Sequence, residues 1–415
     1  MSVIEPRRLR IAMVGTRGVP AAYGGFETAI EEIGQRLAAR GHDVTVYCRS
    51  ANRSRPRTHL GMTLVHLPAL KTKSIETLSH TALSAIHLAL GKRQDAAFVF
   101  NAANAPFVPL IRSRGVATAV HVDGLEWKRG KWGRMGKRYY RVAEQMAVAN
   151  ADALISDAPG IADYYDHEFG IPTELITYGA NILRDPASDR LAELGLEPGQ
   201  YHLVVARFEP ENHVDVIVDG YTASNATLPL VVVGSAPYSA AYTDRIEQVA
   251  TADPRIQRLG GVWDQEQLDQ LYAHALTYLH GHSVGGTNPS LLRAMGAATA
   301  TLANDNVFNR DVLGEDGRFW SDAAGVAALV EGAEAAAEEA LATGRRLQER
   351  AEETYDWDAI ADGYEELAAR MTRGYSTHGM SRGVRSATRW EPRLRAADAD
   401  ADRADRAPSI LEESR

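Results

Sequence analysis

Residues 9–48 read LRIAMVGTRGVPAAYGGFETAIEEIGQRLAARGHDVTVYC, and this segment decides the fold. The apolar run 9–15 predicts a buried parallel strand. A glycine-rich loop follows over residues 15–25, and a helix is expected from about Phe26 to Arg40, where a glycine ends it. Residues 44–48 then form the next strand. This order is a βαβ unit with a right-handed crossover onto a parallel sheet.

The same alternation of strands and helices continues along the chain and predicts two doubly wound α/β domains. A polar stretch over residues 177–186 marks the boundary between them. A helix over residues 357–373 is expected to be the last folded element, and the Ala/Asp/Arg-rich tail after it is expected to be disordered. The further strands that we expect are 97–100, 117–120 and 153–156 before the boundary, and 202–206, 228–234, 256–260, 277–280 and 300–303 after it.

Composition narrows the class of protein. The 415 residues are 45% hydrophobic and 24% charged, which is ordinary for a globular protein, and the net charge of −9 makes a nucleic-acid partner a poor expectation. A single cysteine, Cys48, excludes an internal disulfide and a cysteine-based zinc cluster. Neither a membrane span nor a secretory leader stands out. We therefore expect a cytoplasmic protein, with peripheral contact at the inner membrane face left open.

Seven short motifs occur in order along the chain: GTRGVP (15–20), YGGFE (23–27), RGHDVTV (40–46), RFEPEN (207–212), GGTNPSLL (285–292), DNVFNRDVL (305–313) and YDW (355–357). Together, over residues 9–373, they resemble family 4 of the glycosyltransferases. The resemblance is strongest to the bacterial branch that contains rhamnosyltransferases of surface polysaccharide synthesis.

The resemblance implies a GT-B fold, with two Rossmann-like domains facing each other across a cleft. Residues 1–182 would form the acceptor domain and 183–353 the donor domain, while helix 354–373 would cross back to the first domain and 374–415 would be the tail. It also implies a retaining transferase without a metal or other cofactor. The donor would be a TDP- or UDP-linked hexose, L-rhamnose or a related deoxysugar, and the acceptor a glycan, a lipid-linked sugar or a small molecule.

Two glycine-containing loops are candidate donor sites. Gly24 and Gly25 precede a helix and would bring bare backbone N–H groups to the donor, although a turn alone also explains them. In the second half, Gly286, Thr287 and Asn288 lead into a helix with proline in its first turn. Their N–H groups would surround an anion at the positive helix end. By resemblance, this second loop holds the donor sugar and its diphosphate.

Arg207 follows a strand at the sheet edge where α/β proteins bind ligands, and its guanidinium could clamp a phosphate. Many relatives place a lysine at the position of Asn212, so here Arg207 would carry the diphosphate charge with helix dipoles alone. A surface arginine with no role in binding is the alternative. No DxD-type metal pair stands out, since Asp123 has no acidic residue two positions away.

His121, Asp123 and Glu126 follow a strand of the first domain and are the candidate catalytic residues. By resemblance, His121 takes the place of a sugar-contacting residue, whereas Asp123 and Glu126 would hold acceptor hydroxyls. In such retaining enzymes the donor phosphate takes the acceptor proton, so these side chains would orient the acceptor. A buried structural histidine is the alternative for His121.

The segment Trp127–Arg141 is basic and aromatic, and it is either a solvated helix face or a patch for an anionic lipid headgroup or a pyrophosphate-linked acceptor.

Arg293 is a departure from the family, which carries glutamate there to hold the ribose. Because arginine has no acceptor atom, it cannot replace that glutamate. Either the nucleoside is held differently, or donor binding is weakened, or Arg293 reaches a phosphate.

Two other function classes remain open. A catalytically impaired GT-B protein acting as a partner subunit would explain Arg293. A nicotinamide-dependent enzyme is the weaker alternative, because no GxGxxG motif follows the first strand and Cys48-Arg49 stands where an acidic residue is expected.

Overall fold

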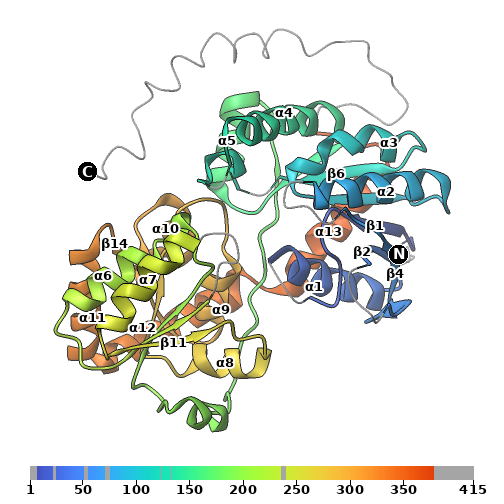
Figure 1. The fold of residues 1–415 in the computed structure, drawn as a ribbon. Coiled ribbons are helices and arrows are strands. Elements are labelled where there is room, and N and C mark those ends of the chain that lie inside the picture. Colours follow the sequence, from blue (N-terminus) through green and yellow to red (C-terminus); the bar gives the residue numbers. More distant parts are fainter. Residues whose placement is uncertain are drawn as a thin grey trace. The chain divides into compact units, whose positions relative to one another are not determined.

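The computed structural model describes residues 7–21, 25–50, 55–70, 75–122, 124–130, 132–234 and 240–377. Two compact units make up the chain, and each contains its own sheet (Figure 1). The first unit comprises residues 1–127, 134–176 and 358–415, and the second comprises 128–133 and 177–357. The predicted class, two α/β domains with parallel sheets, is confirmed. The predicted tail from residue 378 onward lies outside the described residues.

The first sheet has the strand order β3-β4-β2-β1-β5-β6-β7-β8, and only β3 runs antiparallel to its neighbour. Ile11 in β1 is level with Val44 in β2 on one side and with Ala96 in β5 on the other. The strands are β1 (Arg10–Val14), β2 (Asp43–Arg49), β3 (Thr58–His59), β4 (Met62–Leu67), β5 (Ala96–Phe100), β6 (Ala117–His121), β7 (Ala153–Ser156) and β8 (Glu174–Leu175).

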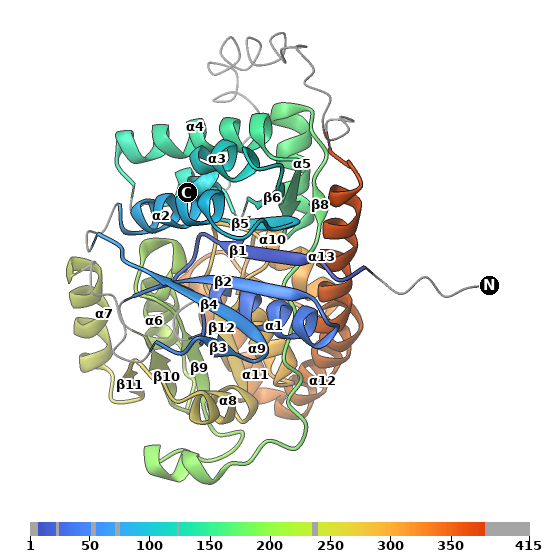
Figure 2. The same cartoon turned by 90° about the vertical axis from the view of Figure 1, so that its right-hand side faces the viewer.

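Helices cover both faces of this sheet, which explains why its central strands are continuous apolar runs. Figures 1 and 2 show α2, α3 and α4 gathered on the same side of the first unit. The helices are α1 (Gly25–Ala39), α2 (Glu76–Leu90), η1 (Ala102–Phe107), α3 (Val108–Arg112), η2 (Glu126–Lys128), α4 (Arg134–Asn150), α5 (Pro159–Phe169) and α13 (Trp357–Thr372).

The last helix, α13, packs on the first sheet. The ring of Tyr364 lies 4.8 Å from that of Phe98 in β5, and Glu365 accepts a hydrogen bond of 2.9 Å from Arg40 at the end of α1. This confirms the part of the predicted fold in which the final helix returns to the first domain.

The second sheet has the order β11-β10-β9-β12-β13-β14, and its strands are parallel. Leu203 and Val204, neighbours in β9, enter different apolar clusters on opposite faces of the sheet. The strands are β9 (His202–Val205), β10 (Leu230–Val233), β11 (Ile256–Gly260), β12 (Thr277–His280), β13 (Ala300–Asn304) and β14 (Arg318–Trp320).

The helices of the second unit connect these strands on both faces, as the doubly wound arrangement requires. They are η3 (Asp189–Leu194), η4 (Pro210–Asn212), α6 (Val214–Ala223), α7 (Ala240–Ala252), α8 (Gln265–Ala273), α9 (Pro289–Gly296), α10 (Val307–Leu313), η5 (Gly314–Asp316), α11 (Ala323–Ala335) and α12 (Ala337–Thr354). Among the described residues, none of the helices combines the length and apolar character needed to cross a bilayer.

Candidate functional site

The strand order of the second sheet indicates where a ligand site is expected. The order of connection reverses between β9 and β12, and in open α/β sheets ligands bind in the crevice beyond the carboxyl ends of two such strands. The loop after β9 contains Arg207 and Asn212, and the loop after β12 contains the segment 281–288. The structure thus brings the donor-binding candidates of these two loops to one edge of the sheet.

Asn212 joins the two loops. Its Nδ2 donates to the carbonyl of Arg207 at 2.7 Å, and its Oδ1 accepts from Nδ1 of His282 at 2.7 Å. Burial, together with the nearby Arg129 charge, holds the pKa of His282 well below its ordinary value. The ring is therefore neutral at pH 7, and the bond to Asn212 places its proton on Nδ1, which leaves Nε2 as an acceptor. Sequence reasoning missed His282, because nothing in the sequence paired it with Asn212.

Arg207 is available for a ligand. Its side chain is 47% exposed, and the carboxylate of Glu209 lies 3.8 Å from its guanidinium. The Glu209 side chain is 19% exposed, but an ion pair this long, with its arginine half-exposed, contributes little to stability, so the guanidinium is not committed to the fold. A planar fork of N–H donors in this position suits a phosphate oxygen pair.

The loop from Gly285 to Asn288 enters α9 with a defined geometry. Gly285 has φ +114°, a conformation that favours glycine, and Thr287 is buried. Asn288 is the N-cap, and its Oδ1 accepts the N–H of Ser290 at 2.9 Å. Asn288 thus caps the helix with its side chain, in addition to the role predicted for its backbone.

The structure places Arg293 against α8. Its Nε donates to Asp269 at 2.8 Å, and its two terminal nitrogens donate to the side chain and the carbonyl of Gln265 at 2.9 and 3.0 Å. Tyr272 lies beneath the guanidinium at 5.7 Å. With its three nitrogens engaged by one helix, this arginine holds α8 to α9, an arrangement that the sequence did not predict.

In the first unit, β1 and β5 flank the corresponding reversal of strand order. Asn104 bridges the ends of both strands, since its Nδ2 donates to the carbonyls of Gly15 and Phe100 at 3.2 and 2.8 Å. Gly25 is the first residue of α1, whereas Gly24 lies outside the described residues. The role predicted for these two glycines stays a prediction.

His121 is the last residue of β6 and is buried against two aromatic rings that also contact each other. Phe100 stacks on it at 5.7 Å, and Phe26 meets it edge-on at 5.3 Å. Burial lowers the pKa of His121 to about 3, so the imidazole is neutral at pH 7. Glu126 in η2 is also buried, and Asp123 lies outside the described residues.

The pH dependence of the free energy of unfolding tests whether His80, His121 and His280 are buried as neutral rings. Burial lowers the pKa of His80 to about 4 and those of His121 and His280 to about 3, against about 6.5 in the unfolded chain. Below pH 6.5 the unfolded state binds more protons, so each ring should reduce the free energy of unfolding by up to about 1.4 kcal/mol per pH unit until the pH passes the folded pKa.

Urea unfolding between pH 7.5 and pH 5 measures this loss. The variant His121→Gln should show a shallower pH slope than the wild type, whereas His167→Gln should not, because the His167 side chain is 88% exposed. An unchanged slope in His121→Gln would contradict the assignment.

The basic segment is divided between the two units. Arg134, Lys137, Arg138 and Arg141 are exposed along α4, and the Arg141 guanidinium lies 4.9 Å from the centroid of the Trp127 ring. Lys128 and Arg129 belong to the second unit, and Lys131 lies outside the described residues.

Sequence reasoning also missed Glu144, on the inner side of α4. Burial raises the pKa of its carboxyl to about 7, and the hydroxyl of Tyr164 donates to it at 3.2 Å. The helical pattern could have marked this position as inward-facing, but it gave no reason to single out the carboxyl.

Within the described residues no three His, Cys, Asp or Glu side chains gather in a way that could hold a metal ion.

Two family models match the chain. Residues 9–181 match "Domain of unknown function (DUF1972)", and residues 192–354 match "Glycosyl transferases group 1". Among curated proteins, none matches the chain.

Solved structures share the fold at low identity. Sucrose-phosphate synthase from Thermosynechococcus elongatus has a TM-score of 0.74 and 20% identity, covering 88% of this chain and 99% of that one. HepE from Anabaena, in complex with UDP-glucose, has a TM-score of 0.71 and 14% identity, covering 87% and 100%. A glycosyltransferase from Rickettsia africae has a TM-score of 0.67 and 12% identity, covering 88% and 98%. The fold class is that of GT-B proteins.

Proposed function

We propose that this glycosyltransferase, whose second half matches a group 1 domain, transfers a hexose with retention of configuration and without a metal. L-Rhamnose or a related deoxysugar is our first choice of sugar, on TDP or UDP as carrier. The acceptor is a glycan, a lipid-linked sugar or a small molecule. The proposal rests on the motifs of residues 9–373 and, for a nucleotide-sugar donor, on neighbours such as HepE, whose structure contains UDP-glucose.

The observation that carries the donor assignment is the joined pair of loops at β9 and β12. Asn212 fixes the backbone of Arg207 and the ring of His282, so a cation and a neutral acceptor stand at one strand edge. A leaving nucleoside diphosphate gains negative charge as the glycosidic bond breaks, and a fixed guanidinium together with the start of α9 would stabilise that charge.

In the proposed reaction with the acceptor, His121 transfers no proton. Because its pKa is about 3, the neutral ring cannot act as an acid at pH 7, and its packing against two aromatic rings suits a packing and orienting role. In the proposed mechanism a phosphate oxygen of the donor takes the acceptor proton, and Asp123 and Glu126 hold acceptor hydroxyls.

A thermal-shift panel with UDP, GDP, TDP and TDP-L-rhamnose tests the donor site. At 100 times Kd a nucleotide stabilises the wild type by about 2.7 kcal/mol, so one carrier should raise Tm clearly. Arg293→Ala should lower the stability of the free protein by about 1–3 kcal/mol, because the charge-assisted hydrogen bonds of the guanidinium to Asp269 and Gln265 on α8 are lost, while the shift with nucleotide persists.

Arg293→Glu separates the two function classes. It restores the family's residue but places a carboxylate near Asp269, so we expect it to be less stable than the wild type, without a gain in nucleotide shift. A shift that appears only in Arg293→Glu would contradict the proposal and would favour the impaired scaffold acting as a partner subunit.

A further inference from the structure

The outward face of α2 is mostly apolar: its exposed residues are Leu83, Ile86 and Leu90, together with His87, whose Nδ1 is hydrogen-bonded to the hydroxyl of Tyr47 at 3.1 Å. Between Thr77 and Gly91 the sequence has no Asp, Glu, Lys or Arg. Leu83, Ile86 and Leu90 lie one and two turns apart on the same stripe of the helix, and they are 38%, 45% and 80% exposed. A surface helix of a globular protein normally presents polar residues to solvent. In α2, by contrast, most of the side chains that face the solvent are apolar.

The end of β4 continues this surface. Leu67 and Pro68 line a hollow of about 490 Å³ together with the exposed stripe of α2, and Leu70, 59% exposed, follows them. We call this surface, made of Leu67, Pro68, Leu70, Leu83, Ile86 and Leu90, the α2 face. Contiguous exposed apolar surface of this kind marks an interaction site.

Basic groups border the α2 face. Lys92 and Arg93 are exposed just beyond the end of α2, and exposed Arg114, after α3, donates to the carbonyl of Ala89 at 2.7 Å. Helix α4, on which Arg134, Lys137, Arg138 and Arg141 are exposed, lies on the same side of the first unit as α2 and α3 (Figure 2). A protein of net charge −9 thus has a local group of cations at the C-terminal end of this apolar surface.

Acidic groups near the α2 face are already neutralised by arginines. Glu76, at the start of α2, pairs with Arg49 at 3.2 Å. Asp95 accepts the backbone N–H of Arg10 at 2.9 Å and pairs with its guanidinium. An approaching negative surface would therefore meet little repulsion.

We propose that the α2 face docks on an anionic lipid bilayer, with Leu83, Ile86 and Leu90 entering the boundary between headgroups and acyl chains. A helix that lies in the bilayer interface buries an apolar face there, while neighbouring lysines and arginines contact the phosphates. A second copy of the chain fits less well, because a symmetric contact would bring the two groups of cations together.

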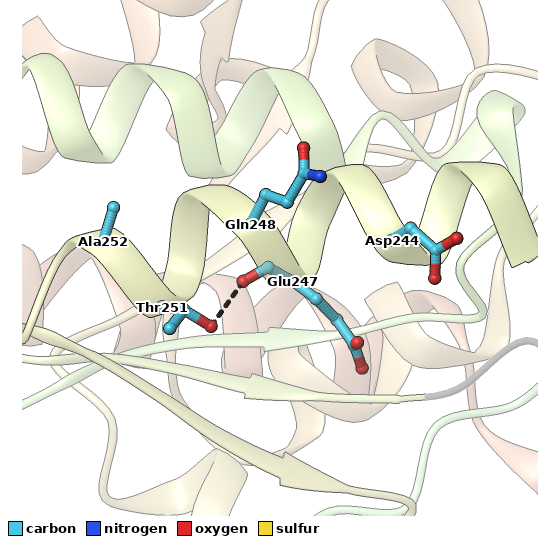
Figure 3. Close-up of a pocket in the computed structure, with 5 residues that line it drawn as sticks. All are labelled: Asp244, Glu247, Gln248, Thr251 and Ala252. Carbon is cyan, nitrogen blue, oxygen red and sulfur yellow. Dashed lines mark hydrogen bonds between the residues drawn. The ribbon is translucent and has the colours of Figure 1, made fainter.

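A second hollow among the described residues has the opposite chemistry. It lies along α7, with a volume of about 570 Å³, and the side chains that line it all come from this one helix (Figure 3). Asp244 and Glu247 give it a negative character, and the hydroxyl of Thr251 is turned back to the carbonyl of Glu247 at 2.6 Å. Anionic lipid would be repelled there.

Sedimentation with vesicles of phosphatidylcholine, with and without phosphatidylglycerol, tests the proposal on the full chain. The wild type should sediment with the anionic vesicles. A triple variant, Leu83→Ser, Ile86→Ser and Leu90→Ser, should bind them at least about tenfold more weakly, because the apolar groups that enter the interface are gone. Lys92→Glu with Arg93→Glu should remove the preference for phosphatidylglycerol.

The matched control is Val307→Ser with Leu341→Ser, two apolar residues of the second unit that are 42% and 44% exposed. It should bind vesicles as the wild type does. Wild-type binding by the triple variant would overturn the proposal. So would a concentration-dependent dimer, seen by sedimentation velocity without vesicles, that the triple variant abolishes. Nucleotide thermal shifts, measured in parallel, report on the donor site separately and confirm that each variant is folded.

Discussion

Replacing Arg207 with alanine is expected to lower kcat/KM for glycosyl transfer by roughly 100- to 1,000-fold, the usual cost of removing one group that stabilises developing charge. The free energy of unfolding should stay within about 1 kcal/mol of the wild type, since the half-exposed guanidinium is engaged only by Glu209 at 3.8 Å among the interactions described. Initial rates with the nucleotide sugar identified by the thermal-shift panel, together with urea unfolding, measure both quantities.

Two further variants separate charge from geometry. Arg207→Lys keeps the positive charge but loses the bidentate fork, so its activity should fall between those of alanine and the wild type. Arg245→Ala is the matched control, because Arg245 is a 57% exposed arginine of the same unit, paired with Asp219 at 2.6 Å. It should leave activity unchanged. Equal activity of Arg207→Ala and the wild type would remove the diphosphate assignment.

The architecture could be predicted from the sequence because parallel strands covered on both faces are uninterrupted apolar runs. The predicted segments 9–15 and 44–48 contain β1 and all but the ends of β2, and the predicted helix differs from α1 by one residue at each end. In contrast, β4 and α2 were not predicted. Met62–Leu67 includes Thr63 and His66, and α2 has no charged face to reveal its period.

The site was less predictable than the fold, because its side chains are organised by partners distant in sequence. Arg293 is bound to Gln265 and Asp269, which are 28 and 24 positions away. The pairing of Asn212 with His282 spans 70 positions. A motif can name such residues, but only the folded sheet determines what each side chain faces. The sequence alone therefore left open whether the nucleoside is held differently, donor binding is weakened or Arg293 reaches a phosphate.

The close approach of the two donor-site loops gives the second large effect. A Cβ added at Gly281, directly after β12, would lie 2.0 Å from the carbonyl oxygen of Asn212, which is far inside van der Waals contact. Backbone would have to move, so Gly281→Ala should destabilise the protein by about 1–3 kcal/mol. The displaced loop also carries Arg207, and a shift of this kind should reduce activity about 100-fold.

Gly332→Ala is the control, because it replaces a glycine whose added Cβ contacts no other atom. Gly332 lies within α11, and a Cβ there would meet no atom within 4 Å. The substitution should stabilise the protein by about 0.5–1 kcal/mol, because alanine loses less backbone freedom than glycine in a helix, and it should leave activity unchanged. If Gly281→Ala matched Gly332→Ala in both thermal unfolding and initial rate, the two loops could separate freely. The rigid placement of Arg207 by Asn212, on which the donor assignment rests, would then be wrong.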